Sequence, residues 1–483
     1  MKLKDKNLLC QRGYINGEWV DADSKKVIEV SNPATGEIVG TVPNMETAET
    51  RRAIHFANEA FPGWRSQTAK FRSDILRKWY NLLIENIDDL AAILTSEQGK
   101  PLSEAIGEIQ YTASFIEWFS EEAKRTYGDV IPTHKPDARI VVTREPVGVV
   151  AAITPWNFPL AMIARKVGPA LAVGCTMVYK PATYTPLSAY ALAYLGEKAG
   201  IPPGVFNVIT GGSGPIGKEL TSNPIVRKLT FTGSTSIGKK LLVQCAETVK
   251  KVSMELGGNA PFIVFDDASL DDAIQGAMVA KFRNMGQSCI AANRFYVQSG
   301  IYDEFVNKFS QKIREIKVGN GFDKGVTQGP LIDMAGVEKV EEHVKDAIDN
   351  GAKVVIGGKR HSLGRTFYEP TVISGVTQNM LVCGDETFGP LSAIIKFENE
   401  KEVIGMANDT EYGLASYLYT RDLGRAWRVS EALEYGMVGI NEGLVSAANA
   451  PFGGVKESGL GREGSKYGTD DYTEMKYLLM GGI

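Results

Sequence analysis

The chain has 483 residues, a net charge of −4, 43% apolar residues and 23% charged residues. This length predicts two or three domains, and this balance is that of an ordinary soluble globular protein, which excludes extensive disorder. So small a net charge, with no long run of Lys or Arg, also argues against a nucleic-acid partner.

The first 125 residues are predicted to begin with a polar start and to be mainly helical only from residue 45 onward. Residues 1–6 are too polar for a signal peptide, and no apolar run in the chain approaches a membrane span, so we expect a cytoplasmic protein without a membrane partner. Helical character extends over residues 45–125. Between residues 71 and 94 the apolar positions recur every three or four residues, which indicates one buried helix face.

From residue 147 onward, short β-branched runs alternate with helical segments. The strand candidates are 147–153, 176–179, 205–209 and 229–231, and 188–198 is a helix candidate. A second series has strand candidates at 262–265, 294–297, 354–356 and 393–397. This alternation predicts parallel sheets, which bind ligands at the carboxyl ends of their strands. We therefore expect an α/β protein with two parallel-sheet lobes.

Two further segments have extended character. Residues 127–146 contain prolines and interrupt the helical region, and residues 472–480 form a strand candidate near the C-terminus. There is no internal repeat and no low-complexity linker in the chain.

Two glycine-rich turns are candidates for holding a phosphate. The string GSGPIG at 212–217 matches G-x-G-x-x-G, but the acidic residue expected about twenty positions later is absent. The string FTGSTSIG at 231–238 follows a strand and opens a helix, whose first backbone N–H groups can hold a pyrophosphate. Ser234 can cap this helix and approach the phosphate. For both strings, a turn or cap without a ligand is the alternative.

Cys289 is the candidate nucleophile among five scattered cysteines. No Cys-x-x-Cys occurs, and none of the four histidines stands at ligand spacing from a cysteine or carboxylate, so we expect neither a disulfide framework nor a metal site. Gly-Gln-Ser before Cys289 indicates a turn that can present a thiol; a buried small apolar residue is the alternative. Only about a few per cent of a free thiol is ionised at neutral pH, so a base is needed. Glu255, where an apolar run gives way to Gly-Gly, is the candidate base.

Motifs in order along nearly the whole chain resemble those of the aldehyde dehydrogenase superfamily. MELGG at 254–258 and GQSC at 286–289 resemble its paired active-site signatures. The other matching segments are TPWNFP at 154–159, KPA at 180–182, FTGST at 231–235, ETFGP at 386–390 and PFGG at 451–454.

The resemblance implies a fold of two Rossmann-like parallel-sheet lobes and a small β flap for oligomerisation. The NAD(P)-binding domain would comprise residues 1–126 and 146–255, and the catalytic domain residues 256–455. Residues 127–145 and 470–483 would form the oligomerisation segment. By this resemblance the protein is expected to be a homodimer or homotetramer.

The resemblance also implies a covalent mechanism. Cys289 would add to the aldehyde carbon, while the Asn157 side chain and the Cys289 backbone N–H stabilise the oxyanion. Hydride transfer to the nicotinamide would leave a thioester, and Glu255 would activate the water that hydrolyses it. Lys166 matches a lysine linked to proton movement around Glu255.

Cofactor contacts follow from the same resemblance. Lys180 matches a ribose-binding lysine, Ser234 a phosphate-binding serine and Glu386 the carboxylate on the nicotinamide ribose. Phe388 would lie near the nicotinamide, and the Gly212 string further toward the adenosine. The other expected contacts are Thr154, Pro155, Trp156, Thr183 and Gly233.

The position three residues after Lys180 bears on the choice between NAD and NADP. Members that prefer NAD often carry Glu there, and this chain has Thr183. Because a carboxylate would repel a 2′-phosphate, whereas Thr beside Lys180 can accept one, we expect NADP to be favoured over NAD.

Within the superfamily the chain most resembles the succinate-semialdehyde dehydrogenases. The segments that carry this resemblance are MIARK at 162–166, KFRN at 281–284, GLVS at 443–446 and 458–468. Arg165 and Arg283 match the arginines for the substrate carboxylate, which suits the guanidinium fork, and Ser446 matches their hydroxyl partner. A surface ion pair is the alternative for either arginine alone. Glutarate semialdehyde stays open, because one methylene is worth only roughly 1–3 kcal/mol of discrimination.

Two other functions stay open. An inactive relative kept as a structural protein would be expected to lose Cys289, Glu255 or Asn157, and all three are present. A CoA-acylating member would pass the thioester to a thiol, whereas the retained Glu255 favours hydrolysis. Ala291 stands where some relatives carry a second cysteine, so their regulatory disulfide is expected to be absent.

Overall fold

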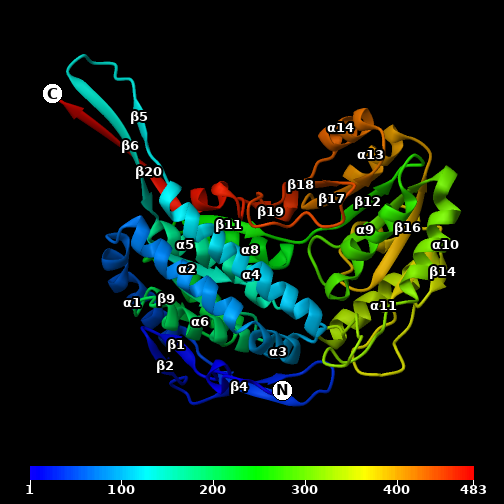
Figure 1. The fold of residues 1–483 in the computed structure, drawn as a ribbon, viewed down its shortest axis with the longest axis horizontal. Coiled ribbons are helices and arrows are strands. Elements are labelled where there is room, and N and C mark those ends of the chain that lie inside the picture. The colour runs from blue at the N-terminus through cyan, green and yellow to red at the C-terminus, as the bar shows by residue number, and fades with distance from the viewer.

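A computed structural model describes all residues, 1–483. The chain forms two lobes, each built on a large and mainly parallel sheet, and a narrow β projection that carries the C-terminus (Figure 1). This architecture confirms the α/β fold with two parallel-sheet lobes expected from the sequence. No helix is both long and apolar enough to cross a bilayer.

The first lobe is built on an eight-stranded sheet with the order β19-β11-β10-β7-β8-β9-β1-β2. Its parallel strands are β7 (Val149–Ile153), β8 (Thr176–Lys180), β9 (Phe206–Val208), β10 (Val226–Thr232) and β11 (Lys251–Glu255). Its antiparallel edge strands are β1 (Gly13–Ile15), β2 (Glu18–Val20) and β19 (Gly459–Leu460). The strand candidates between residues 147 and 231 are thus confirmed.

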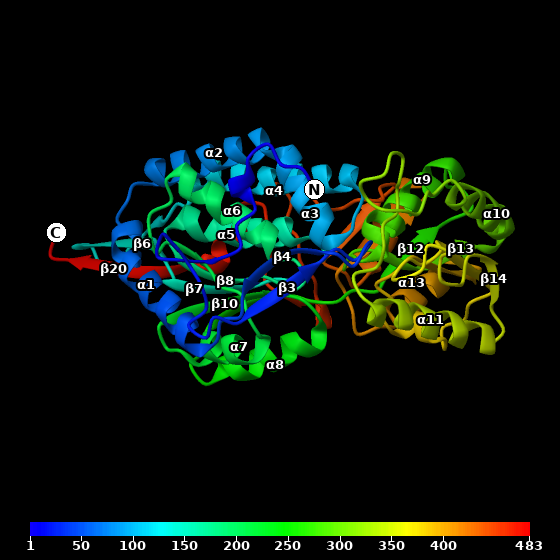
Figure 2. The same ribbon diagram turned by 90° about the horizontal axis from the view of Figure 1, so that it is seen from below.

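Helices cover both faces of this sheet, because its central strands are buried on both sides (Figure 2). One face packs against α2 (Ala69–Glu85), α4 (Leu102–Glu122), α5 (Pro159–Val173) and α6 (Leu187–Ala199). The other face packs against α1 (Thr47–Arg65), α7 (Ser213–Ser222) and α8 (Thr235–Ala246). The carboxyl ends of β7, β10 and β11 lie beside the second lobe.

The amphipathic stretch at residues 71–94 is divided between two helices. α3 (Ile87–Gln98) begins directly after α2, with Asn86 at the junction. Trp79 is completely buried, whereas Phe71, at the start of the stretch, is 43% exposed. The periodicity therefore identified the buried face but not the break at Asn86.

The second lobe is built on a seven-stranded sheet with the order β14-β15-β16-β13-β12-β17-β18. Its strands are β12 (Ala260–Val264), β13 (Ala292–Gln298), β14 (Lys353–Ile356), β15 (Thr371–Ser374), β16 (Leu391–Phe397), β17 (Ala415–Tyr419) and β18 (Met437–Ile440). The helices around it are α9 (Leu270–Phe282), α10 (Tyr302–Ile313), α11 (Met334–Asp349), α12 (Leu381–Gly384), α13 (Glu400–Asn408) and α14 (Leu423–Ala432). All neighbouring strands are parallel except β14 and β15. The second series of strand candidates is confirmed as well.

The projection is a three-stranded antiparallel sheet with the order β20-β6-β5 (Figure 1). β5 (Asp129–Ile131) and β6 (Ala138–Pro146) come from the extended segment in the helical region, and β20 (Thr473–Gly481) comes from the C-terminus. β20 pairs with β6 along its whole length, and from Glu474 onward its side chains are exposed. The two extended segments therefore pair with each other and leave β20 as an open edge.

The C-terminal part of the chain returns to the first sheet after β18. β19 pairs with β11 and places Gly459 opposite Glu255. The segment after β19 consequently lies beside the end of β11. The remaining elements are β3 (Val27–Ser31), β4 (Ile38–Pro43), η1 (Lys6–Leu8), η2 (Ala123–Arg125), η3 (Arg283–Gly286), η4 (Ser299–Ile301), η5 (Lys456–Ser458) and η6 (Lys466–Tyr472).

Candidate active site

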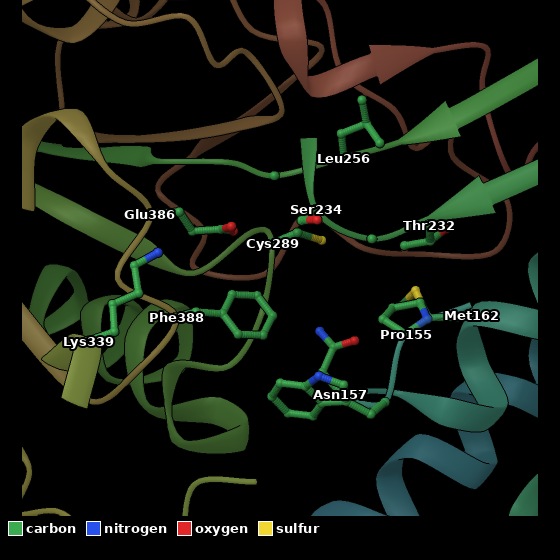
Figure 3. Close-up of a pocket in the computed structure, with 13 residues that line it drawn as sticks. Pro155, Asn157, Met162, Thr232, Ser234, Leu256, Cys289, Lys339, Glu386 and Phe388 are labelled. Atoms are coloured by element: carbon green, nitrogen blue, oxygen red, sulfur yellow. The ribbon is translucent and has the colours of Figure 1, made fainter. Parts of the chain in front are cut away.

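A cavity of about 260 Å³ lies between the two lobes (Figure 3). The first lobe lines it with residues just beyond β7, β10 and β11. These residues are Pro155, Trp156, Asn157, Thr232, Gly233, Ser234, Leu256 and Gly257, together with Met162 of α5. The second lobe contributes Cys289, Lys339, Glu386 and Phe388. A hollow at the carboxyl ends of parallel strands is the place where such sheets bind ligands.

Cys289 lies in the turn between η3 and β13 and lines the cavity (Figure 3). Asn284 and Met285 of η3 have positive φ angles of 52° and 59°, so the backbone bends sharply before the cysteine. A Cβ at Gly258 would lie 2.3 Å from the carbonyl oxygen of Cys289, which requires glycine there. Burial raises the pKa of the Cys289 thiol to about 12. The thiol therefore needs a proton acceptor before it can react.

Asn157 is tied to the turn that carries the cysteine. Its Nδ2 donates to the carbonyl of Gln287 at 3.0 Å. Its backbone carbonyl accepts hydrogen bonds from Lys100 Nζ at 2.8 Å and from Asn284 Nδ2 at 2.9 Å. Lys100 is completely buried and forms an ion pair with Glu108 of α4 at 2.5 Å. These contacts hold the Asn157 amide at the cavity wall that Cys289 shares.

Glu255, the last residue of β11, is only 2% exposed. Its Oε2 has no hydrogen-bond partner, and a Cβ at Gly453 would lie 3.0 Å from its Oε1. Burial and the negative charge of Glu463 raise the pKa of Glu255 well above its usual range. The carboxyl group lies near enough to Cys289 for its charge to act on the thiol. A carboxylate whose pKa is raised is a stronger base than an ordinary carboxylate.

Lys166 lies in α5 and is completely buried. Its Nζ forms an ion pair with Glu463 Oε1 and makes no hydrogen bond to Glu255. Arg165, its neighbour in the sequence, lies with Nε 3.0 Å from Glu463 Oε2. The lysine expected to move protons around Glu255 is thus paired with a different carboxylate, that of Glu463.

The residues expected to contact the cofactor fall into two groups. Those that line the cavity are Pro155, Trp156, Gly233, Ser234, Glu386 and Phe388. Thr154 and Lys180, which do not line it, lie at the carboxyl ends of the neighbouring strands β7 and β8, where the Thr154 N–H donates to the Lys180 carbonyl at 3.3 Å. Thr183 follows in an exposed turn. Apart from Glu386 and Phe388, which come from the second lobe, these residues lie along one edge of the first sheet.

Two groups at this edge are free to bind oxygen atoms. Burial lowers the pKa of Lys180 to about 8, and its Nζ donates only to the carbonyl of Pro181 at 3.2 Å. Ser234 is the N-cap of α8, but its hydroxyl caps no backbone N–H of the helix. The N–H groups in the first turn of α8 are thus open to an anion. The Gly212 string opens α7 and does not line the cavity.

Glu386 and Phe388 reach the cavity from the loop before β16. Glu386 Oε1 accepts a hydrogen bond from the Gly258 N–H at 3.2 Å, and burial raises the pKa of Glu386 to about 7. The Phe388 ring stands edge-on to Trp156, with the ring centres 5.6 Å apart. The two lobes therefore meet across the cavity through an aromatic pair (Figure 3 labels Phe388).

A second, narrower pocket shares Cys289 and Met162 with the first. Its lining comprises Tyr111, Phe158, Met162, Arg165, Arg283, Ser288, Cys289, Ile290, Ser446 and Phe452. The structure thus brings together Arg165, Arg283 and Ser446, the three residues expected to bind a substrate carboxylate. The Arg283 guanidinium lies over the Phe158 ring at 4.8 Å, and the Ser446 hydroxyl is hydrogen-bonded to that of Tyr111.

Arg165 is the most unusual group in this pocket, because it is 1% exposed and yet only partly paired. Neither its Nε nor its Nη1 has a hydrogen-bond partner, and its Nη2 lies 2.8 Å from the sulfur of Met162. A buried guanidinium with unused donors is costly unless a ligand supplies acceptors. The pocket is therefore suited to an anionic group.

Some residues of the site were not singled out from the sequence. Lys339 lines the cavity, Tyr111 and Phe452 line the pocket, and Glu463 joins Arg165 to Lys166. Lys339 and Tyr111 lie on amphipathic helices, where nothing local distinguishes them. Phe452 and Glu463 lie in two segments, PFGG and 458–468, that resemble the family as whole motifs without pointing to either residue. For Glu463, the only signal in the sequence is a charged residue among glycines and serines. No cluster of His, Cys, Asp and Glu is placed to hold a metal ion.

The chain matches the aldehyde dehydrogenase family model over residues 19–478. It is 64% identical to glutarate-semialdehyde dehydrogenase from Pseudomonas aeruginosa and 60% identical to the succinate-semialdehyde dehydrogenase of Escherichia coli that is named for NADP(+), in each case over 100% of both chains. It is also similar to the crystal structure of succinate-semialdehyde dehydrogenase from Burkholderia pseudomallei. That similarity covers 100% of both chains with 60% identity and a TM-score of 0.99.

Proposed function

Since the chain belongs to the aldehyde dehydrogenase family, we propose that it oxidises a short semialdehyde, an aldehyde with a carboxylate at its far end, using NADP or NAD. The observation that carries this proposal is Arg165, a buried cation whose Nη1 has no partner in the pocket that Cys289 lines. A neutral aldehyde offers Nη1 no charged acceptor, whereas a carboxylate offers one. Relatives named for two such semialdehydes support the same substrate class.

In the proposed reaction, the Cys289 sulfur attacks the aldehyde carbon and its proton passes to Glu255. The Asn157 amide uses one hydrogen on the Gln287 carbonyl and has the other free for the developing oxyanion. The backbone N–H of Cys289 is the second donor. Departure of a hydride leaves a thioester on Cys289. Once Glu255 has released the thiol proton to solvent, it activates the water that releases the acid.

The edge of the first sheet fits a dinucleotide. The open first turn of α8 suits a pyrophosphate, and the Lys180 ammonium and the Glu386 carboxylate suit ribose hydroxyls. A Cβ at Gly257 would lie 3.1 Å from Glu386 Oε2, so glycine keeps this part of the cavity open. When bound, the nicotinamide ring supplies the hydride acceptor.

The proposed preference is for NADP over NAD. Thr183 places no negative charge in the exposed turn after Lys180, so nothing there repels a 2′-phosphate. The name of the Escherichia coli relative, which includes NADP(+), supports this preference.

Succinic semialdehyde is the proposed substrate, and glutaric semialdehyde is the alternative. The same three side chains, Arg165, Arg283 and Ser446, serve a carboxylate in either case. One added methylene changes transition-state binding by only roughly 1–3 kcal/mol, so both are expected to turn over. The relatives named above include one for each substrate.

We further propose that the protein is a homodimer or homotetramer formed through the β projection. β20 is an open edge strand whose exposed side chains include Met475, Tyr477 and Leu479. An unpaired edge and exposed apolar side chains on a narrow sheet are typical of an interface.

The test is a cofactor-reduction assay that crosses NADP and NAD with succinic semialdehyde, glutaric semialdehyde and the neutral four-carbon aldehyde butanal. We expect kcat/KM to be at least tenfold higher for the semialdehydes than for butanal, and free acid to form without CoA. Cys289→Ala should abolish turnover. Equal or better use of butanal, or turnover in Cys289→Ala, would contradict the proposal.

A further inference from the structure

Glu463 contacts two cations, Lys166 and Arg165, that have different expected roles in the reaction. One of its carboxylate oxygens forms an ion pair with Lys166, and the other lies 3.0 Å from Arg165 Nε. Both partners come from consecutive positions in α5, and all three side chains are at least 95% buried. A single carboxylate therefore neutralises a cation of the proton path and a cation of the substrate pocket.

The backbone around Glu463 builds a clamp for Arg165. Phe452 and Glu463 form an isolated antiparallel bridge, in which the Phe452 N–H donates to Glu463 at 2.8 Å and the Glu463 N–H donates to Phe452 at 2.7 Å. The Arg165 guanidinium lies over the Phe452 ring, 4.1 Å from its centre. Two paired residues thus supply a carboxylate and an aromatic face to the same guanidinium.

This clamp leaves Arg165 Nη1 available. Nε is held beside Glu463 and Nη2 beside Met162, whereas Nη1 has no hydrogen-bond partner. Arg165 lines the narrow pocket together with Cys289. Glu463 and Met162, which hold Nε and Nη2, therefore fix the direction in which the free Nη1 donor points.

We propose that Glu463 is a positioning residue for the substrate carboxylate, because it holds Arg165 in the orientation that leaves a donor for the ligand. The inference deepens the proposed function and rests on it. Without Glu463 the Arg165 guanidinium would lose the ion pair that fixes its orientation. The binding of a substrate with a terminal carboxylate would then weaken more than the binding of a neutral aldehyde.

The charges around Glu463 support an ionised carboxylate in this role. Arg165 and Lys166 face it from α5, and Lys228 acts on it from β10. Burial works to raise the pKa of Glu463, but these cations hold it below the usual range. The acidic and phenolic groups nearby are Glu255 of β11, Asp471 and Tyr472. Removing one member of so dense a cluster of buried charges leaves others uncompensated.

The test compares succinic semialdehyde with butanal in wild type, Glu463→Gln and Glu463→Asp. The measured quantity is the ratio of kcat/KM for the two substrates, in which any loss of proton transfer common to both cancels. We expect Glu463→Gln to lower this ratio about tenfold or more, the usual size for a hydrogen bond to a charged group. The loss should fall mainly on KM for the semialdehyde, with KM for butanal unchanged.

Matched variants separate positioning from general damage. Asp471→Asn removes a neighbouring carboxylate that does not contact Arg165, and it should leave the ratio unchanged. In an Arg165→Met background, Glu463→Gln should lower the ratio no further. If Glu463→Gln does not fold, as judged by circular dichroism, Glu463→Asp and Phe452→Leu carry the test, and each should lower the ratio.

Equal losses on both substrates, or an unchanged ratio in the folded variants, would overturn the inference. Failure of the proposed function itself looks different. A wild-type protein that does not favour the semialdehyde over butanal would contradict that function, whereas a wild-type preference that survives in the Glu463 variants would contradict only the role of Glu463.

Discussion

At the scale of single residues, the proposed chemistry depends on charges that surround a half-buried cysteine. Burial raises the pKa of Cys289 to about 12, and burial with the charge of Glu463 raises that of Glu255. The raised pKa of Glu255 suits the raised pKa of Cys289, because a weakly acidic thiol needs a stronger base to remove its proton. Motif positions on the sequence pointed to both residues, but their electrostatics arise from contacts with a distant segment.

The first prediction concerns the reactivity of the free thiol. Because the pKa of Cys289 lies far above neutral pH, its thiolate fraction increases about tenfold for each unit by which the pH rises toward that pKa. We expect the rate of iodoacetamide alkylation of Cys289, in protein without cofactor, to climb steadily from pH 7 to 10. Peptide mass spectrometry assigns the alkylation to Cys289. A plateau near pH 7–8 would show that the thiol is already ionised there.

The second prediction concerns cofactor choice at Thr183. A carboxylate placed within about 4 Å of a 2′-phosphate near the surface costs on the order of 1–4 kcal/mol. Thr183→Glu should therefore lower kcat/KM for NADP tenfold or more and leave kcat/KM for NAD near the wild-type value. Thr183→Gln is the control of equal length without charge. Equal effects on the two cofactors would remove Thr183 from the 2′-phosphate site.

At the scale of elements, α4 positions the start of α5 and thereby Asn157, the proposed oxyanion donor. α5 has no side-chain cap of its own, and Glu108 of α4 accepts hydrogen bonds from the N–H groups of Leu160 at 3.0 Å and Ala161 at 3.3 Å. The same carboxylate pairs with Lys100, which in turn binds the carbonyl of Asn157. An acidic group at a helix N-terminus also stabilises the helix dipole.

The third prediction tests this buried ion pair. Lys100→Met leaves Glu108 charged and unpaired in a completely buried position, a loss that typically costs about 3–5 kcal/mol. We expect a fall in Tm of several degrees by differential scanning fluorimetry and a lower kcat, because Asn157 loses a contact. Lys4→Met removes an exposed ion pair with Asp88 and should leave Tm unchanged. A Lys100→Met protein as stable as wild type would contradict this account.

The sequence predicted most elements of both sheets because their strands are buried runs that recur at regular spacing. It did not predict β1, β2 or β19, which are only two or three residues long and are defined by their partners. Nor did it predict β15, β17 and β18 of the second sheet, which are four or five residues long. Pairing of Gly459 with Glu255 joins positions about two hundred residues apart, and no local pattern encodes such a contact. The motifs identified Cys289, whereas Glu463 became visible as part of the site only through this long-range pairing.

At the scale of the whole molecule, two lobes enclose the cavity and the β projection stands apart from both (Figure 1). The lobes divide the site between them, since Asn157 comes from the first and Cys289 from the second. The projection shares neither lobe's core and leaves the apolar side chains of β20 exposed. Such a segment is more readily explained by association than by catalysis.

The fourth prediction tests that association. A variant with Met475→Glu and Tyr477→Glu places two negative charges on one face of β20. We expect it to have a smaller mass than wild type in size-exclusion chromatography with light scattering. Leu423→Glu, at an exposed position of α14 on the second lobe, is the control and should keep the wild-type mass. An unchanged mass in the β20 variant would place the interface elsewhere.

The central claim is that the Cys289 sulfur carries the acyl group of the oxidised substrate until Glu255 directs its hydrolysis. The most direct measurement mixes Glu255→Gln protein with succinic semialdehyde and NADP, quenches the mixture in acid and determines the mass of the peptide that contains Cys289. The account predicts a mass increase of one succinyl group on Cys289, which decays slowly compared with wild type. An unmodified Cys289 while NADPH forms, or an acyl group on another residue, would contradict it.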